Sequence, residues 1–116
     1  QIASNQSQLK LGDTSPTRDL NFVLDTCKGF MLLAESNNAV GEVINIGSNN
    51  EISIGEVASI IKSQMESDID IVLDPQRIRP KKSEVVRLWC DNKKIKDNDS
   101  VINNKNKDRI KTIIGK

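Results

Sequence analysis

The sequence contains no tyrosine and no histidine, and its aromatic residues are limited to Phe22, Phe30 and Trp89. Without histidine, neither a Ser-His-Asp triad nor a Cys-His pair can be assembled from this chain. Cys27 and Cys90 are too few for a four-cysteine zinc site, and a histidine-containing zinc site is excluded as well. A tyrosine acting as general acid or base is also excluded. We therefore expect no catalytic residue and no metal ligand set among these residues.

Long apolar runs are absent too. Hydrophobic residues make up 36% of the 116 positions, and none of the apolar stretches approaches the roughly 18 residues of a membrane-spanning helix. The polar residues 1–8 lack the charged and apolar regions of a signal peptide. Two cysteines far apart in such a chain are expected to stay reduced. We predict a cytoplasmic protein, or a piece of one, with one modest core.

Charge is unevenly distributed, although the net charge is only +1. Residues 1–90 carry nine Lys and Arg against 12 Asp and Glu, whereas residues 91–116 carry eight against four. The end of the chain is therefore a basic, Asn- and Lys-rich segment on a mildly acidic body. Its few apolar residues leave a weak helix and an irregular tail as alternatives. It lacks interleaved aromatic residues, so we do not expect nucleic acid as a partner.

Short extended segments are the first kind of element that the hydrophobic pattern predicts. They cover residues 9–11, 20–23 and 68–73, and the β-branched run at residues 42–47 (EVINIG) is typical of a buried strand in a parallel sheet. A buried strand needs neighbours on both edges, and this chain offers few. We therefore expect self-association, or a rearrangement in which the other three segments protect its edges.

Two main amphipathic helices separate these segments. Asp25 or Thr26 can cap the first helix, in which apolar residues at three- and four-residue intervals place Cys27 in the core. The second helix starts at Ser53, because Glu56 three residues later completes a capping box. Short strands that alternate with two main helices predict the α/β fold class.

Arginines are the strongest candidates for binding chemistry, because the planar guanidinium pairs with phosphate oxygens and keeps its charge. Arg18 precedes an extended segment, and Asp19 beside it can orient its guanidinium. Arg77 and Arg79 lie in a loop that is stiffened by Pro80. Two separated arginines that converge on one pocket would suit a diphosphate. The alternative is that each is a surface residue with incidental ion pairs.

Other polar residues give weaker signals. Glu84 and Asp91 could accept hydrogen bonds from sugar hydroxyls, although for Asp91 the capping of a short third helix is the simpler interpretation. Gly47, Ser48 and Asn49 follow the expected buried strand. They contain one glycine, whereas a dinucleotide-binding loop has three.

Three segments in this order carry a resemblance to a known family: GDTSPTRDLNFVLDTCKGF, GEVINIGSNNEISIGEVASII and QRIRPKKSEVVRLWCDNKKIK. They resemble the C-terminal part of NAD-dependent epimerases/dehydratases, the extended short-chain dehydrogenases/reductases that act on nucleotide sugars. The nearest members are the UDP-N-acetylglucosamine 4,6-dehydratases of legionaminic-type sugar biosynthesis, which serve cell-surface polysaccharides. The resemblance covers residues 1–96 and implies an incomplete, substrate-side portion of an extended Rossmann-type fold. Residues 97–116 are then a separate basic tail.

The resemblance also implies a substrate site. Arg18 matches the family arginine that contacts the nucleotide diphosphate, and Arg79 matches the second such arginine. Glu84 stands where the family often has an aspartate that binds the ribose hydroxyls. Asn21 lies near the substrate side of the RDLNFV segment. The loop between Pro80 and Glu84 is longer than in the commonest family pattern.

The implied reaction is a dehydration in which the cofactor carries the redox step. In the intact family enzyme, NAD takes hydride from carbon 4 of the hexose, water leaves across carbons 5 and 6, and hydride returns to carbon 6. The family's Rossmann half and its Tyr-x-x-x-Lys pair are missing here, so we expect substrate binding without catalysis and no NAD on this chain alone. Expected partners are a UDP-sugar, the missing Rossmann half and a second copy of the chain, but no membrane. The alternatives are a 4-epimerase fragment and a non-catalytic binding or interaction module.

Overall fold

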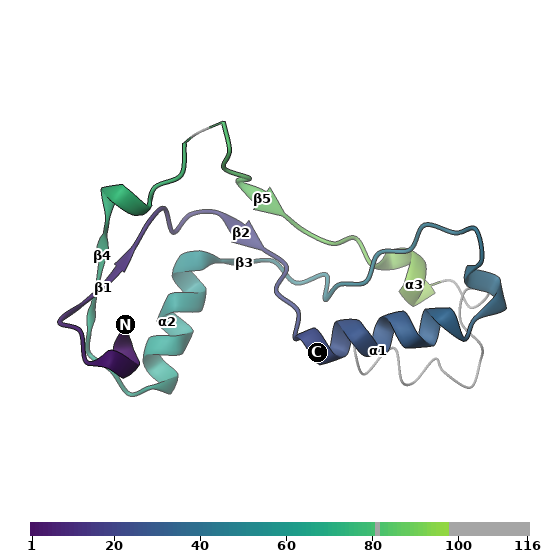
Figure 1. Ribbon diagram of the computed structural model, residues 1–116, viewed down its shortest axis with the longest axis horizontal. Coiled ribbons are helices and arrows are strands. Elements are labelled where there is room, and N and C mark those ends of the chain that lie inside the picture. Colours follow the sequence, from purple (N-terminus) through teal and green to yellow (C-terminus); the bar gives the residue numbers. More distant parts are fainter. Residues whose placement is uncertain (81, 98–116) are drawn as a thin grey trace. The chain divides into compact units, whose positions relative to one another are not determined.

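A computed structural model describes residues 1–80 and 82–97, so the predictions for the tail after residue 97 lie outside it. Short strands alternate with two main helices, α1 and α2, which confirms the predicted α/β class (Figure 1). No helix within the described ranges is long and apolar enough to cross a membrane. The elements in chain order are η1 (Ile2–Ser4), β1 (Gln8–Leu11), β2 (Thr17–Arg18), α1 (Val23–Ala34), η2 (Asn37–Ala39), β3 (Ile52–Ser53), α2 (Ile54–Gln64), β4 (Asp70–Leu73), η3 (Pro75–Arg77), β5 (Arg87–Leu88) and α3 (Lys93–Asp97).

The chain divides into two compact units. Unit 1 contains Gln1–Arg18 and Ile52–Leu88, and unit 2 contains Asp19–Glu51 together with the chain from Trp89 onward. Both units are therefore built from segments that are distant in the sequence. The strands β1 to β5 all belong to unit 1, whereas unit 2 contains α1, η2 and α3.

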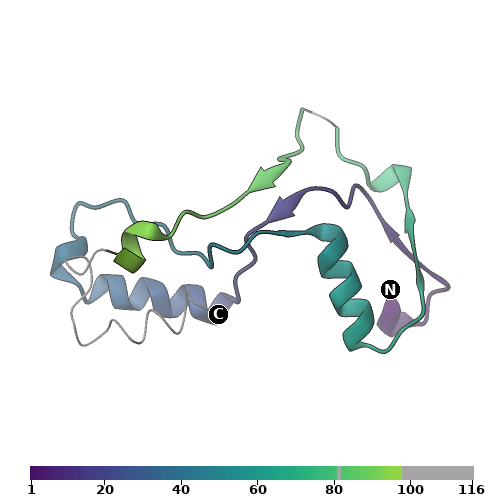
Figure 2. The same cartoon turned by 180° about the vertical axis from the view of Figure 1, so that it is seen from behind.

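Unit 1 contains a parallel two-stranded sheet. Strand β1 pairs with β4, with Leu9 opposite Ile71, and the two strands run side by side in both views (Figures 1 and 2). Beyond the strands, the backbone N–H of Asp74 extends the pairing by donating to the carbonyl of Leu11 at 2.7 Å. The first and last of the predicted extended segments are thus confirmed, and they pair with each other.

Helix α2 begins at the residue that the sequence predicts. The Ser53 hydroxyl accepts a hydrogen bond from the Glu56 backbone N–H at 3.1 Å, and the Glu56 carboxylate accepts one from the Ser53 backbone N–H at 2.9 Å. These two bonds satisfy donors that the first turn of a helix leaves unpaired. The apolar side of α2, with Leu9 and Leu11 of β1, lines an apolar cavity of about 330 Å³.

A second sheet in unit 1 joins three two-residue strands. The central strand β2 is antiparallel to β3 and parallel to β5, so Arg18 lies opposite Ile52 on one side and Leu88 on the other. The backbone N–H of Thr17 also donates to the carbonyl of Val86 at 2.9 Å. Main-chain pairing therefore ties the end of the segment that follows Arg79 to the strand that carries Arg18.

Helix α1 in unit 2 starts earlier than predicted. Its N-cap is Phe22, and the backbone N–H groups of Asp25 and Thr26 both donate to the carbonyl of Phe22. The prediction that Asp25 or Thr26 caps this helix is therefore wrong, because both residues lie within the first turn. The extended segment predicted at residues 20–23 is not a strand either, since Val23 is already helical.

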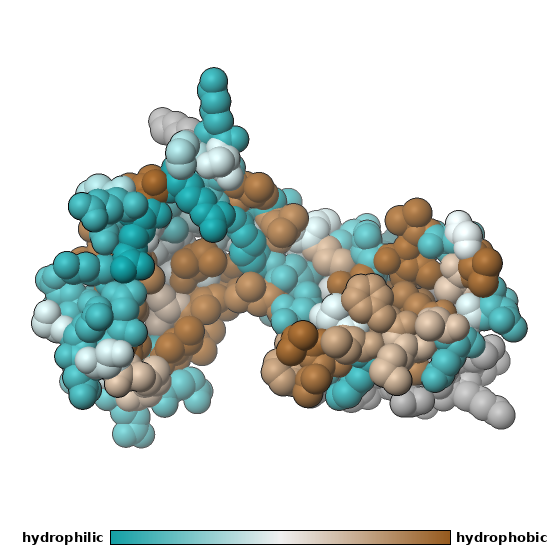
Figure 3. Space-filling view, viewed as in Figure 1, coloured by the Kyte–Doolittle hydropathy of each residue, from teal (hydrophilic) through white to brown (hydrophobic). Residues whose placement is uncertain are grey.

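The buried face of α1 is narrow. Leu32 packs against Ile95 of α3, and a Cβ at Gly29 would stand 2.9 Å from the side chain of Ile46, so glycine allows that close approach. Cys27 is exposed, which makes the core placement predicted from its spacing wrong. Apolar side chains also cover the outer surface over α1 in Figure 3. Those with exposed fractions above 60% are Phe22, Val23, Phe30 and Met31.

Residues 42–47 do not form the buried strand predicted for EVINIG, and Val43 is 83% exposed. A strand exists only where a neighbour pairs with its backbone, and the described part of unit 2 offers side chains instead. The amide of Asn92 donates to the carbonyl of Gly47 at 2.6 Å, and the ammonium of Lys94 donates to that of Val43 at 3.0 Å. The predicted protection of this segment by the other extended segments is also wrong, because two of them pair in unit 1.

Candidate functional site

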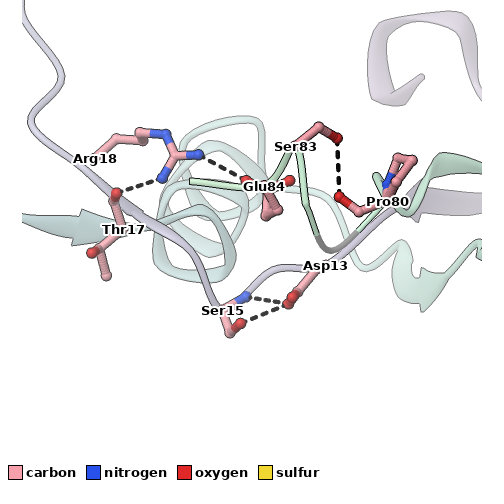
Figure 4. A network of polar contacts seen from close by, with 7 residues as sticks. All are labelled: Asp13, Ser15, Thr17, Arg18, Pro80, Ser83 and Glu84. Carbon is pink, nitrogen blue, oxygen red and sulfur yellow. Dashed lines mark hydrogen bonds and ion pairs between the residues drawn. The ribbon is translucent and has the colours of Figure 1, made fainter. Parts of the chain in front are cut away.

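Two hydrogen bonds hold the guanidinium of Arg18 in place. Its Nη1 donates to the carbonyl of Thr17 at 2.7 Å, and its Nη2 donates to Oε1 of Glu84 at 2.9 Å (Figure 4). The side chains of Arg18 and Glu84 are 19% and 18% exposed. A guanidinium has five N–H donors, so these two bonds fix its orientation and leave further donors for a ligand.

Two local turns position this ion pair. On one side, the backbone N–H and hydroxyl of Ser15 donate to Oδ1 of Asp13 at 2.9 and 2.7 Å, just before β2 (Figure 4). These two hydrogen bonds lower the pKa of Asp13 from its ordinary value. On the other side, the backbone N–H of Ser83 donates to the carbonyl of Pro80 at 2.8 Å, directly before Glu84. One hydrogen-bonded turn thus precedes the strand that carries Arg18, and another directly precedes Glu84.

Asp19 does not orient Arg18, contrary to the sequence-based expectation. Its Oδ1 accepts hydrogen bonds from the backbone N–H and the hydroxyl of Ser48 at 3.1 and 2.5 Å. Its Oδ2 accepts from the backbone N–H groups of Asn49 and Cys90 at 3.0 and 3.3 Å. The Asp19 carboxylate thus ties together two distant segments of unit 2.

The same contacts decide whether the turn after residue 46 could hold a dinucleotide. A phosphate-binding loop presents free backbone N–H groups to the ligand. Here the N–H groups of Ser48 and Asn49 point at the Asp19 carboxylate, and a Cβ at Gly47 would stand 2.3 Å from the Cβ of Cys90. A second negative charge would be repelled by Asp19, so these residues do not fit NAD.

Cys90 lies beside this carboxylate and is half-buried. Burial raises the pKa of its thiol, and the negative charges of Asp19 and Asp91 raise it further. A thiol with a raised pKa is less often a thiolate and is therefore a weaker nucleophile. The predicted third helix is confirmed, and Asp91 accepts a hydrogen bond at 3.0 Å from the backbone N–H of Lys93, its first residue. The first intrahelical bonds go to the carbonyl of Asn92, which occupies the N-cap position predicted for Asp91.

The remaining predicted site residues are less constrained. Arg79 is exposed, and within the described ranges its guanidinium forms no ion pair. Arg77 is also exposed and pairs with Asp74 three residues before it, with Nε 3.2 Å from Oδ2. Asn21 belongs to unit 2, where its amide lies 3.3 Å from Oδ1 of Asp19.

Of the four residues predicted to bind substrate, the structure brings Arg18 and Glu84 into contact. Their pairing joins positions separated by 66 residues, and it gives Glu84 a partner that sequence reasoning did not foresee. The role of Asp19 was missed as well. Nothing in the spacing of Asp19, Ser48 and Cys90 indicates that they share hydrogen bonds, because each comes from a different segment.

Comparisons with known proteins place the chain in a family. The model of the family described as GDP-mannose 4,6 dehydratase matches residues 1–103. A curated relative from Methanocaldococcus jannaschii, described as a putative UDP-glucose 4-epimerase, is 32% identical over 93 residues, which are 80% of this chain and 28% of the relative. The solved structure of an epimerase from Methanothermobacter thermautotrophicus is 38% identical, with a TM-score of 0.62 over 75% of this chain and 25% of that one.

More distant structures support the fold. A UDP-N-acetylglucosamine 4-epimerase from Methanobrevibacter ruminantium, in complex with UDP-N-acetylmuramic acid, has a TM-score of 0.69 at 24% identity and covers 98% of this chain and 35% of that one. RMD from Pseudomonas aeruginosa, in complex with NADPH, has a TM-score of 0.65 at 20% identity and covers 98% and 31%. These neighbours are Rossmann-type enzymes, which confirms the predicted likeness to part of such a fold.

The chain spans 28% of the length of the curated relative and 25% to 35% of the solved structures. The match to the family nevertheless extends over all of the described residues and includes both Arg18 and Glu84. The chain therefore belongs to the GDP-mannose 4,6 dehydratase family, within the NAD-dependent epimerases/dehydratases.

Proposed function

We propose that this chain provides the diphosphate-binding part of the substrate site in a nucleotide-sugar dehydratase or epimerase. The observation that carries the proposal is the largely buried Arg18, whose guanidinium is oriented by its bond to the Thr17 carbonyl and pairs with Glu84. A preoriented guanidinium loses less side-chain entropy when it binds a phosphate than a freely moving one does. It also retains N–H donors for two phosphate oxygens.

Two other predicted residues of unit 1, Arg79 and Glu84, belong to the proposed site. Arg79 is the second diphosphate contact, supplied by the loop after η3 (Pro75–Arg77). Glu84, in the same unit, is proposed to contact polar groups of the nucleotide sugar. For Asn21, which belongs to unit 2, a contact with the substrate is proposed separately, from the resemblance alone. Residues 1–96 then form the substrate-binding region, and residues 97–116 form a basic tail outside it. The chain contains no tyrosine to act as general acid or base, so we assign it binding without chemistry.

The leading candidate for the whole reaction is 4,6-dehydration of UDP-N-acetylglucosamine with NAD as the cofactor. The family model described as GDP-mannose 4,6 dehydratase supports dehydration. Epimerisation at carbon 4 is the second candidate, because the relatives at 32% and 38% identity are both named epimerases. Both reactions start with hydride removal from carbon 4 and need the same grip on the diphosphate.

Two further proposals concern the ligand and the cellular location of the protein. A nucleotide sugar is the ligand that we expect, since a solved neighbour holds UDP-N-acetylmuramic acid. We also propose a cytoplasmic location, because Cys27 and Cys90 are free thiols and thiols persist in a reducing compartment.

The experiment is a titration of the chain with pyrophosphate and with UDP-N-acetylglucosamine, followed by amide chemical shifts. We expect weak binding, on the order of millimolar, because one arginine pair grips the ligand at a site that is partly open to water. Arg18→Ala should weaken binding about tenfold, which corresponds to the loss of one charge-assisted contact. Arg77→Ala is the matched control, since it removes the same charge from the same unit but from a residue that already pairs with Asp74. Equal binding by the Arg18→Ala variant and the unmodified chain would refute the proposal.

A further inference from the structure

We propose that Glu84 competes with the substrate's diphosphate for Arg18, so that the ion pair is an anionic gate on the binding site. The inference rests on the proposed function of Arg18. It starts from one contact, the 2.9 Å bond from Nη2 of Arg18 to Oε1 of Glu84 (Figure 4). The contact belongs to a single unit, because both residues lie in unit 1.

Electrostatics gives the pair its inhibitory effect. A carboxylate at 2.9 Å neutralises the charge with which Arg18 would attract a phosphate, and it repels any anion that approaches the same guanidinium. Both side chains are more than four-fifths buried, so water screens this repulsion less than at an open surface. A diphosphate must therefore displace Glu84 or bind beside it against its charge. The repulsion grows with the charge of the ligand, so a diphosphate feels it more than a monophosphate does.

The side chain of Glu84 can move while the backbone on either side of it stays in place. The next two residues, Val85 and Val86, are 52% and 70% exposed, so the segment is not anchored by apolar packing. Before Glu84, the chain is held by the turn in which Ser83 bonds to the Pro80 carbonyl. After it, the main-chain bond from Thr17 to Val86 fixes the other end. The side chain of Glu84 can therefore leave Arg18 without breaking the β2–β5 pairing.

The Thr17 carbonyl explains why Arg18 would stay in place when Glu84 leaves. Its bond to Nη1 of Arg18 is 2.7 Å long and comes from the adjacent residue in the same strand. This bond does not involve Glu84, so it can persist when Glu84 leaves the guanidinium. Glu84 carries the same sign of charge as the ligand, so it competes with the ligand for Arg18, while the Thr17 carbonyl keeps the guanidinium oriented.

Removal of the competing charge is the direct test. Glu84→Gln keeps the size and a hydrogen-bond acceptor but removes the negative charge. Pyrophosphate should bind this variant about three- to tenfold more tightly, because the fraction of the chain with an available Arg18 rises. The affinity for inorganic phosphate should rise by a smaller factor than the affinity for pyrophosphate. The gain should shrink as salt is added, since added ions screen the repulsion that the substitution relieves.

Controls separate this inference from the proposed function. Glu66→Gln removes the same charge elsewhere in unit 1 and should change the affinity less than twofold. Glu84→Ala is the second variant, and circular dichroism of each variant reports whether it folds. In the double variant Arg18→Ala/Glu84→Gln the gain should vanish, because the gate acts only through Arg18.

Each outcome decides one of the two ideas. Weaker pyrophosphate binding by both Glu84 variants, with binding still dependent on Arg18, overturns the gate and leaves the proposed function standing. Binding that is unaffected by Arg18→Ala overturns both. Tighter binding by Glu84→Gln that is lost in the double variant supports the gate.

Discussion

The interactions that stabilise unit 1 internally differ from those that stabilise unit 2. In unit 1, distant segments meet through main-chain pairing, as in the β1–β4 and β3–β2–β5 sheets. In unit 2, side chains bind backbone groups instead, with Asp19, Asn92 and Lys94 as the main examples. Main-chain pairing follows from a pattern that recurs along a segment, whereas such side-chain contacts depend on single residues. Single substitutions should therefore disturb unit 2 more than unit 1.

Adjacent residues show the same contrast at the candidate site. Arg18 is the last residue of the first segment of unit 1, where it pairs with Glu84 and retains donors for a ligand. Asp19 is the first residue of unit 2, and its carboxylate accepts hydrogen bonds from the backbone N–H groups of Ser48, Asn49 and Cys90. The Arg-Asp dipeptide thus combines a proposed binding residue with a structural one, and the two can be separated by mutation.

The largest effect is expected for Asp19→Ala. The substitution leaves the backbone N–H groups of Ser48, Asn49 and Cys90 without their acceptor, and each unpaired donor that is shielded from water is costly. We expect a loss of about 3 kcal/mol in the free energy of unfolding. Chemical denaturation measures this loss, and hydrogen exchange at the Ser48 amide locates it in unit 2. Asp19→Asn retains one acceptor and should lose less; unchanged protection of the Ser48 amide in Asp19→Ala would contradict the structural role.

Next in size is Gly47→Ala, also in unit 2. The added Cβ would lie 2.3 Å from the Cβ of Cys90, so the two segments must separate. Overpacking of this kind costs about 2 kcal/mol. The matched control in unit 1 is Gly55→Ala, because its Cβ would meet nothing closer than 3.4 Å and alanine favours the first turn of α2. Thermal melting of both variants tests the comparison, which fails if Gly55→Ala is the more destabilised of the two.

A smaller effect is expected for Ser53→Ala, which removes the cap of α2 and should cost about 1 kcal/mol. The hydrogen bonds from the Ser53 backbone N–H and hydroxyl lower the pKa of Glu56 from its ordinary value of 4.5. Because the folded-state pKa is the lower one, this contribution to stability is fully present above pH 4.5 and is lost as the pH falls through the lowered value. Denaturation from neutral to acidic pH should therefore show a weaker pH dependence in Ser53→Ala. The backbone N–H of residue 53 still donates in this variant, so an identical pH dependence in the two proteins would show that the Ser53 hydroxyl does not contribute to the lowered Glu56 pKa.

The smallest perturbation compares the two thiols of unit 2. Cys27 is exposed, whereas burial and the charges of Asp19 and Asp91 raise the pKa of Cys90. Alkylation with iodoacetamide at mildly alkaline pH should modify Cys27 about tenfold faster, since the thiolate is the reacting form. Mass spectrometry of peptides from a time course gives both rates within one sample. Equal alkylation rates would mean that the thiol of Cys90 is as accessible and as reactive as the exposed thiol of Cys27, which contradicts the prediction.

The sequence predicted local features well and long-range pairing poorly. The capping box at Ser53 and the extended segments of β1 and β4 follow from residues that are close together in the chain. The expected strand at residues 42–47 failed because its β-branched residues indicate only a preference, and the pairing partner decides the outcome. Arg18 was identified from its chemistry and its resemblance to the family. Its bond to Glu84 depends on the β2–β5 pairing, which joins segments too distant for any local pattern to reveal.

The most direct measurement follows the side-chain Nε–Hε resonance of Arg18 during a titration with pyrophosphate. If Arg18 binds the diphosphate, this resonance should move saturably, with the same midpoint as the amides of the residues around Glu84. Arg77 lies in the same unit and pairs with Asp74, so its resonance should stay nearly still. Arg18→Lys keeps the charge but loses the planar fork, and it should bind more weakly. A silent Arg18 resonance, while others move on addition of pyrophosphate, would contradict the proposal that this residue grips the substrate's diphosphate.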